Sequence, residues 1–249
     1  MAVKIFPLEK QIKGGFNNGE IVENKPVQSS PDRSKLQPYS TIFYWAHAWA
    51  NKTSTIGLHP HKAFEIMSFV LKGEIEHYDT KNQTWMPLHA GDVQIIRAGN
   101  GISHAEKLIE GSHIFQIWFD PNIASSLNQP ASYNDYRSGD FPVTEKNGFT
   151  ITTFKGENAP VEMQTPGTTI QMIKFKPGAH LLNLDSADIH SLYLIEGDIK
   201  FENNMLHTDD FLLISGESNF DFSSEGGGEL FMITSLALVP YVTYASGSA

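Results

Sequence analysis

The feature that most limits the fold of this chain is a series of short apolar runs, each ended by turn-forming residues. Lys72-Gly73 ends one such run, and Ala90-Gly91-Asp92 precedes another. The runs of the first half are β-branched or aromatic and four to six residues long; they cover residues 66–71, 75–78, 93–96 and 114–119. Runs of this length and composition predict the strands of a β-barrel or β-sandwich.

The same pattern resumes in the second half, after a stretch rich in Asn, Ser, Pro and Gly. Strand-like runs there cover residues 170–175, 192–195, 211–214 and 230–233. The segment 69–75 can be aligned with 193–199, which favours a duplicated β-barrel. We therefore expect a first barrel within residues 1–125, a connector at 126–160 and a second barrel within 161–249.

Two short pairs of residues carry the clearest chemical signal. His59 and His61 are two residues apart, and so are His104 and Glu106. Residues two apart in a strand point to the same face, so two such pairs on neighbouring strands would bring three imidazoles and one carboxylate to one point. This set suits a first-row transition metal and leaves coordination positions open. The alternative is that these histidines lie on the surface and bind no metal.

The sequence around both pairs resembles the pirin family. The resemblance is carried by GLHPHKAFE at 57–65, VLKGEIEHYD at 70–79, GDVQ at 91–94 and AGNGISHAE at 98–106, in the order and spacing of the family. It covers about residues 43–120 and is weak over the second half. Pirins are bicupins, so the resemblance implies an all-β double-stranded β-helix with two cupin barrels in one chain, the metal lying in the first.

Carried over onto the matching positions, the resemblance implies that His59, His61, His104 and Glu106 hold one metal ion. Iron is the metal it implies first, with nickel, manganese, copper, cobalt and zinc as alternatives. The chain departs from the family at Lys62-Ala63, where Arg-Gly is usual, and at Tyr78, where a basic residue is usual. These departures lie beside the four implied ligands and change none of them.

Other residues are secondary candidates. Glu65, four residues after His61, would face the same side of an unbroken strand and hydrogen-bond to a ligand. His77 is followed by Asp79, which would orient its ring; a pair on the sheet surface is the alternative. An apolar pocket around the metal, or simply the core, would contain Phe64, Met67, Phe69, Phe115 and Trp118. The second half has His180, His190 and His207, none of them in a His-x-His or His-x-Glu pair, so we expect its barrel to lack a metal set.

Composition narrows the classes of function. The chain has 28 acidic and 18 basic residues, a formal net charge of -10, which disfavours direct contact with nucleic acid or an anionic membrane. It has no cysteine, which excludes disulfides, thiolate metal ligands and a cysteine nucleophile. Its N-terminus lacks a signal pattern, and no apolar stretch is long enough to span a bilayer, so we expect a cytoplasmic protein.

The resemblance implies two functions. The first is a metal-dependent dioxygenase that cleaves quercetin-type flavonols with molecular oxygen, in which Glu106 is the catalytic proton acceptor. The second is a non-enzymatic, iron-dependent redox-sensing transcription cofactor that acts through protein partners. Another small-molecule reaction, such as an isomerisation or a hydrolysis, is a third hypothesis, because fold alone does not fix function.

Overall fold

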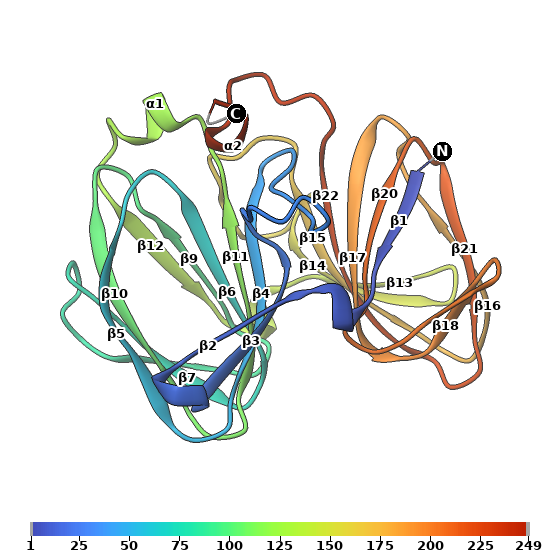
Figure 1. Cartoon of the computed structure of the whole chain (residues 1–249), viewed down its shortest axis with the longest axis horizontal. Coiled ribbons are helices and arrows are strands. Elements are labelled where there is room, and N and C mark those ends of the chain that lie inside the picture. Colours follow the sequence, from blue (N-terminus) through green and yellow to red (C-terminus); the bar gives the residue numbers. More distant parts are fainter. Residues whose placement is uncertain (1, 248–249) are drawn as a thin grey trace. The chain divides into compact units, whose positions relative to one another are not determined.

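The structure is a computed structural model that describes residues 2–247, and it contains two compact units (Figure 1). The N-terminal barrel consists of Gln11–Asp140, Met163–Thr165 and Pro240–Ala249. The C-terminal barrel consists of Met1–Lys10, Phe141–Glu162 and Pro166–Val239. Each unit therefore draws on segments that are far apart in the sequence. The domain boundaries expected above remain a prediction.

The N-terminal barrel is built from two antiparallel sheets. Its seven-stranded sheet has the order β12-β9-β6-β11-β4-β3-β2, and its four-stranded sheet has the order β5-β10-β7-β8. The strands of the first sheet are β2 (Ile12–Phe16), β3 (Ile21–Val27), β4 (Ile42–Ala50), β6 (Glu65–Lys72), β9 (Val93–Arg97), β11 (His113–Phe119) and β12 (Ser132–Tyr136). Those of the second are β5 (Ser54–His61), β7 (Glu74–Asp79), β8 (Met86–His89) and β10 (Ile102–Leu108).

The C-terminal barrel repeats this arrangement. Its sheets have the orders β1-β20-β17-β22-β15-β14-β13 and β16-β21-β18-β19. The strands of the larger sheet are β1 (Ala2–Phe6), β13 (Val143–Lys146), β14 (Phe149–Lys155), β15 (Thr169–Phe175), β17 (Asp188–Gly197), β20 (Phe211–Ser215) and β22 (Gly228–Leu236). Those of the smaller sheet are β16 (Gly178–Asn183), β18 (Ile199–Phe201), β19 (Asn204–Leu206) and β21 (Asn219–Ser224).

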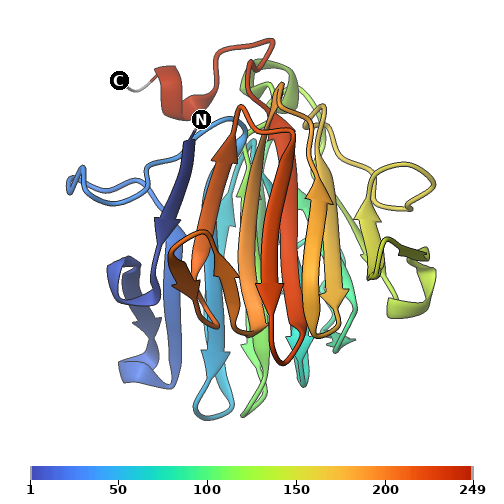
Figure 2. The ribbon, with the colours of Figure 1, turned by 90° about the vertical axis from the view of Figure 1, so that its right-hand side faces the viewer.

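The predicted all-β, duplicated fold is confirmed by the equivalence of the two strand orders. Each strand from β2 to β11 corresponds to the strand eleven labels later, and only the edge strands differ. The N-terminal barrel ends its large sheet with β12, whereas the C-terminal barrel uses β1 at the corresponding edge. Figure 2 shows β1 in dark blue beside the N label, and residues Ala2 to Phe6 pair with β20.

The interior of the N-terminal barrel has two apolar clusters. The first cluster lies near the start of β7 and the end of β10, where Ile75 pairs with Leu108. It consists of Ile21, Ala48, Ala50, Val70, Ile75, Leu88, Leu108 and Ile114. The second contains Ile66, Ile96, Ala98 and Ile102, with Phe64 and Trp118 packed against it. Polar side chains of β6, β10 and β11 lie between these clusters along their strands. The apolar clusters bury these polar groups and so hold them away from bulk water.

Helices are few and short. They comprise the α-helices α1 (Ile123–Ser126) and α2 (Tyr244–Gly247) and the 3-10 helices η1 (Leu8–Lys10), η2 (Asn17–Gly19) and η3 (Ser138–Asp140). Across residues 2–247, no helix has the length and apolar character needed to cross a membrane.

Candidate metal centre

Three imidazoles converge inside the N-terminal barrel. His59 and His61 lie on β5, and His104 lies on the neighbouring strand β10, directly opposite His59 in the register. The ring centroids are 4.8 Å apart for His59 and His61, 4.4 Å for His59 and His104, and 4.8 Å for His61 and His104. One nitrogen from each ring lies within 4.8 Å of the others. The two-residue spacing on adjacent strands produces this cluster, as the sequence predicted.

A register shift in β5 and β10 helps to aim these rings. His104 pairs with His59, but Glu106 pairs with Ile56, so the strand β5 has extra residues opposite Ala105. Such irregularities are common beside functional sites because they redirect side chains. Gly57 lies in this irregular stretch, and its carbonyl oxygen is 2.7 Å from Nδ1 of His59. The carbonyl accepts a hydrogen bond from Nδ1, which leaves Nε2 of His59 as the lone-pair nitrogen.

The buried imidazoles are held in the neutral form. Burial, with smaller contributions from the neighbouring histidines, lowers the pKa of His61 to about 3 and that of His104 to about 2. His104 is almost fully buried, and neither of its ring nitrogens has a hydrogen-bond partner among the described residues; the same holds for Nε2 of His61. Neutral imidazoles with unused lone pairs are what a metal site requires, so His61 and His104 fit a metal ion, and His59 brings a third nitrogen to the same cluster.

Glu106 lies two residues after His104 and is also buried. The side-chain amide of Gln116 on β11 donates to both carboxylate oxygens, at 2.8 and 2.7 Å, and the Ser68 hydroxyl on β6 donates to one of them at 3.3 Å. Trp118 Nε1 in turn donates to Gln116 Oε1 at 3.2 Å. Both carboxylate oxygens therefore accept from side chains, Oε2 from Gln116 alone, and the carboxylate is not part of the tight three-nitrogen cluster. Its role as a fourth ligand stays a prediction.

Sequence reasoning missed Gln116 and Ser68. Both are single polar residues inside otherwise apolar strands, at positions that point into the barrel. A lone amide or hydroxyl in a buried strand needs a hydrogen-bond partner that is also buried. The presence of one polar residue in each apolar strand could therefore have identified Gln116 and Ser68.

His77 lies in the barrel interior and not on the sheet surface. It and Asp79 are each about 1% exposed, so the alternative of a surface pair is wrong. The His77 ring is 5.5 Å from that of His104. The distance from His77 Nδ1 to Asp79 Oδ2 is 3.8 Å, too long for a hydrogen bond. The Asp79 carboxylate instead accepts from the backbone N–H groups of Lys81 and Asn82, both at 2.7 Å.

Other candidates divide between the two faces of the large sheet. Trp118 packs edge-on against His61 at 4.8 Å, and Phe64 lies 6.1 Å from Trp118, so both belong to the metal side. Since Ser68 and Gln116 face inward, the alternation of the strands turns the remaining expected pocket residues to the opposite face; these are Met67, Phe69 and Phe115.

Glu65 does not hydrogen-bond to an expected metal ligand, so that expectation was wrong. The strand is broken between His61, which ends β5, and Glu65, which begins β6. The Glu65 carboxylate instead accepts from the backbone N–H groups of Gln164 and Thr165 at 2.7 and 2.9 Å and from the Thr165 hydroxyl at 2.6 Å.

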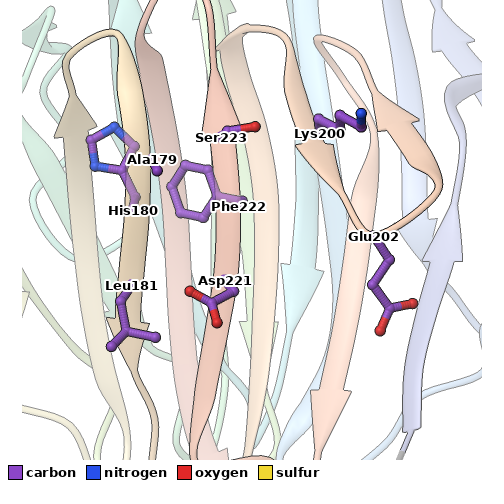
Figure 3. A pocket seen from close by; sticks show the side chains of 8 residues that line it. All are labelled: Ala179, His180, Leu181, Lys200, Glu202, Asp221, Phe222 and Ser223. Atoms are coloured by element: carbon purple, nitrogen blue, oxygen red, sulfur yellow. The ribbon is translucent and has the colours of Figure 1, made fainter.

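The corresponding strands of the C-terminal barrel carry mostly apolar groups. His180 on β16 is paired with Phe222 on β21, and Figure 3 shows their rings beside each other. The two ring centroids are 5.2 Å apart. Leu182 and Phe220 form the next inward-facing pair. The histidine rings of this barrel already have polar partners: His180 has the Lys176 carbonyl at 2.7 Å, His190 has Thr234 Oγ1 and the Asp185 carbonyl at 2.9 Å, and His207 has Asp198 at 2.7 Å.

Comparisons with known proteins agree with the fold. A sequence model of the family described as Pirin matches residues 23–119. The chain is 34% identical to Pirin-like protein 2 of Arabidopsis thaliana over 128 residues, which is 49% of this chain and 39% of that protein. It is 29% identical to a putative quercetin 2,3-dioxygenase of Pasteurella multocida over 166 residues, 65% of this chain and 68% of that protein.

A solved structure shows the same fold over nearly the whole chain. It is a bacterial pirin from Escherichia coli in complex with nickel(II), with a TM-score of 0.75, 17% identity, and coverage of 95% of this chain and 100% of that one. The fold is therefore that of the bicupins. The sequence matches to the first curated relatives span half of their length or less.

Proposed function

We propose that this protein is a metal-dependent dioxygenase that cleaves quercetin-type flavonols with molecular oxygen, and the match of residues 23–119 to the Pirin family model supports this proposal. The observation that carries the proposal is the cluster of three histidines, whose nitrogens lie within 4.8 Å of one another, beside a buried carboxylate. Similarity to a putative quercetin 2,3-dioxygenase supports the choice of substrate.

The proposed ligands are His59, His61, His104 and Glu106, holding one ion. We propose iron first, with nickel, manganese, copper, cobalt and zinc as alternatives, because the same donor set serves several first-row ions. A bound ion would act as a Lewis acid that lowers the pKa of a coordinated hydroxyl of the substrate.

Glu106 is the proposed acceptor for the proton of the flavonol 3-hydroxyl. Its carboxylate is buried, and Oε1 accepts from both Gln116 and Ser68, whereas Oε2 accepts from Gln116 alone and keeps a lone pair that can take the proton. Gln116 orients the carboxylate, and Trp118 holds Gln116 through its indole N–H. Positioned proton transfer of this kind contributes roughly 10²–10⁴-fold to the rate.

Trp118 and Phe64 form the proposed apolar wall beside the ligands. Trp118 lies edge-on to His61, and Phe64 packs against the apolar cluster that contains Ile66 and Ile102. A planar aromatic substrate would pack against these rings, and they would exclude water from the reacting atoms.

The decisive experiment measures flavonol and oxygen together. Metal-free protein is loaded separately with iron, nickel, manganese or copper, and quercetin absorbance and dissolved oxygen are followed. We expect at least one form to consume both. Glu106→Gln should lower kcat by at least about 100-fold, whereas His207→Ala, a matched histidine variant in the other barrel, should keep full activity. Unchanged quercetin in these four metal forms and in the cobalt and zinc forms would refute the proposal.

The ligand assignment has its own test, which needs no substrate. Metal analysis of the purified native protein should find one ion per chain. His104→Ala and Glu106→Ala should each lower this content, and His207→Ala should not. Undiminished metal in both ligand variants would overturn the assignment while leaving the fold unaffected.

The alternative function is a non-enzymatic, iron-dependent redox sensor that acts on protein partners. Similarity to proteins named Pirin from Arabidopsis thaliana and Homo sapiens favours it. The formal charge of -10 favours a protein partner over direct contact with nucleic acid. Ferrous and ferric protein should then retain different partners in parallel pull-downs, and identical partners in both states would count against redox switching.

A further inference from the structure

A cavity in the N-terminal barrel is lined by residues of the connection between β3 and β4 and by residues of helix α2. Its volume is about 280 Å³, and its walls include Arg33 and Pro38 from the connection, Phe43 from β4 and Tyr244 from α2. All of these residues belong to the same compact unit. The volume is at the lower end of small-molecule sites, which suits a ligand with a single ring.

One wall of this cavity carries a cation that has no partner. The Arg33 side chain is exposed, and within the described chain it makes no ion pair or hydrogen bond. The adjacent carboxylate of Asp32 is engaged elsewhere, because its Oδ1 accepts from the backbone N–H of Ser34 at 2.9 Å and from the Ser34 hydroxyl at 2.7 Å. A free guanidinium in a chain of net charge -10 is a local site for an anion, and its planar fork matches a carboxylate.

Another part of the cavity wall is aromatic. The rings of Phe43 and Tyr244 meet edge to face, with centroids 5.7 Å apart and an interplanar angle of 78°. The Asp120 carboxylate accepts the backbone N–H of Tyr244 at 2.6 Å. Phe64 packs behind this pair, 4.6 Å from Phe43 and 5.7 Å from Tyr244, so a ligand ring would lie on the parts of Phe43 and Tyr244 that line the cavity, where the two rings form a corner for face and edge contacts.

We propose that this cavity binds a small aromatic carboxylate, with the carboxylate on Arg33 and the ring in the corner of Phe43 and Tyr244. The site is distinct from the metal centre. Phe43 stacks on Trp118 at 6.4 Å, and Trp118 covers His61, so a layer of aromatic rings separates the two sites. The proposal does not depend on the dioxygenase activity.

The test is a calorimetric titration of the metal-free full-length protein with benzoate at low ionic strength. We expect a dissociation constant of about 1 mM or lower. Benzamide, which has the same shape without the charge, and acetate, which has the charge without the ring, should each bind at least about tenfold more weakly. Nickel-loaded protein should bind benzoate with the same affinity, because the anion site is separate from the metal.

Two variants assign the binding to this cavity. Arg33→Gln should weaken benzoate binding at least about tenfold, whereas Lys52→Gln, which removes another exposed cation, should leave it unchanged. Tyr244→Leu keeps an apolar contact but removes the ring, and should weaken binding about three- to tenfold. Binding that survives Arg33→Gln, equal affinity for benzamide, or loss of binding when nickel is added would each overturn the proposal.

Discussion

For single residues of the candidate metal centre, the sequence predicts the direction of a side chain where that direction follows from the two-residue period of a strand. The spacing of His59, His61 and His104 placed their rings on one face, and the register of β5 and β10 brings them together. The partners of Glu106 were not predictable, because Gln116 and Ser68 come from strands that are adjacent to it only in space. A sequence pattern reports the direction of a side chain, but it does not report which strand lies opposite.

Ala63 illustrates a residue whose departure from the pirin pattern that the sequence resembles has a physical cost. It lies in the turn between β5 and β6 with φ of 67°, in the left-handed region that favours glycine. Its backbone is fixed there, because its N–H donates to the Gly99 carbonyl at 2.9 Å and its own carbonyl accepts from Ser126 Oγ at 2.6 Å. The usual glycine of the family at this position therefore has a structural explanation.

We expect Ala63→Gly to raise the free energy of unfolding by about 0.5–1 kcal/mol, since relief of the left-handed strain outweighs the added entropy of the unfolded chain. Urea denaturation measures the change. Ala124→Gly, in the short helix α1, is the matched control and should be destabilising. Equal effects of the two substitutions would contradict the argument.

Asp120 is a buried carboxyl group whose charge the fold disfavours. Burial raises its pKa to about 6, although the backbone N–H groups of Tyr244 and Ala245 oppose the rise. The folded protein therefore binds the proton more tightly than the unfolded chain, whose aspartate titrates near 3.8. The stabilisation from this proton is complete below about pH 4 and is lost as the pH rises through about 6.

Asp120→Asn should remove this contribution to the pH dependence. Between pH 4.5 and 7.5, the native protein should lose up to about 2 kcal/mol of stability more than the variant does. Urea unfolding of both proteins at the two pH values gives this difference, and other titrating groups cancel in the comparison. Parallel pH profiles would show that Asp120 is not the responsible group.

At the scale of elements, the apolar runs predicted the strands, but they did not predict every position at which one strand ends and the next begins. The expected continuity from His61 to Glu65 fails because the turn at Ala63 separates β5 from β6. Glu65 then contacts a segment about a hundred residues later, where it holds three donors of Gln164 and Thr165. No local pattern reports such a contact, because it depends on how the chain returns.

Glu65→Ala should lower the free energy of unfolding by about 3–5 kcal/mol, because it leaves buried donors without an acceptor. Glu76→Ala is the matched control: Glu76 pairs with Lys107 at the surface, so its removal should cost less than about 1 kcal/mol. Chemical denaturation measures both. If Glu65→Ala were as mild as its control, the segment 163–165 would not be held by this carboxylate.

At the scale of the whole molecule, the duplication was visible in the sequence only at a few turns. The full equivalence of strands β2–β11 with β13–β22 emerges from the sheet orders. The sequence did not predict that β1 forms the edge of the second large sheet, since β1 pairs with β20 more than two hundred residues away. Local sequence cannot predict which edge a terminal strand will join, because every edge offers the same backbone groups.

The edge strand β1 should stabilise the C-terminal barrel alone. Val3 and Ile5 pack against the core of that barrel, so the double substitution to alanine should lower its unfolding free energy by about 2–4 kcal/mol. Lys4→Ala, on the other face of the same strand, is the matched control and should have little effect. Metal content should be unchanged in both variants. A loss of bound metal in the double variant would contradict the expectation that β1 stabilises only the C-terminal barrel.

The position of β1 also has a consequence for how the protein is made. Leu8 donates its backbone N–H to Asp210, and the two residues are 202 positions apart. A ribosome adds about 5–20 residues per second, so the first strand would wait roughly 10–40 s after its synthesis for its partner to be translated. During that interval the first barrel can close, while β1 has no sheet to join. The second barrel can therefore close only after β20 has been synthesised, long after its own first strand has left the ribosome.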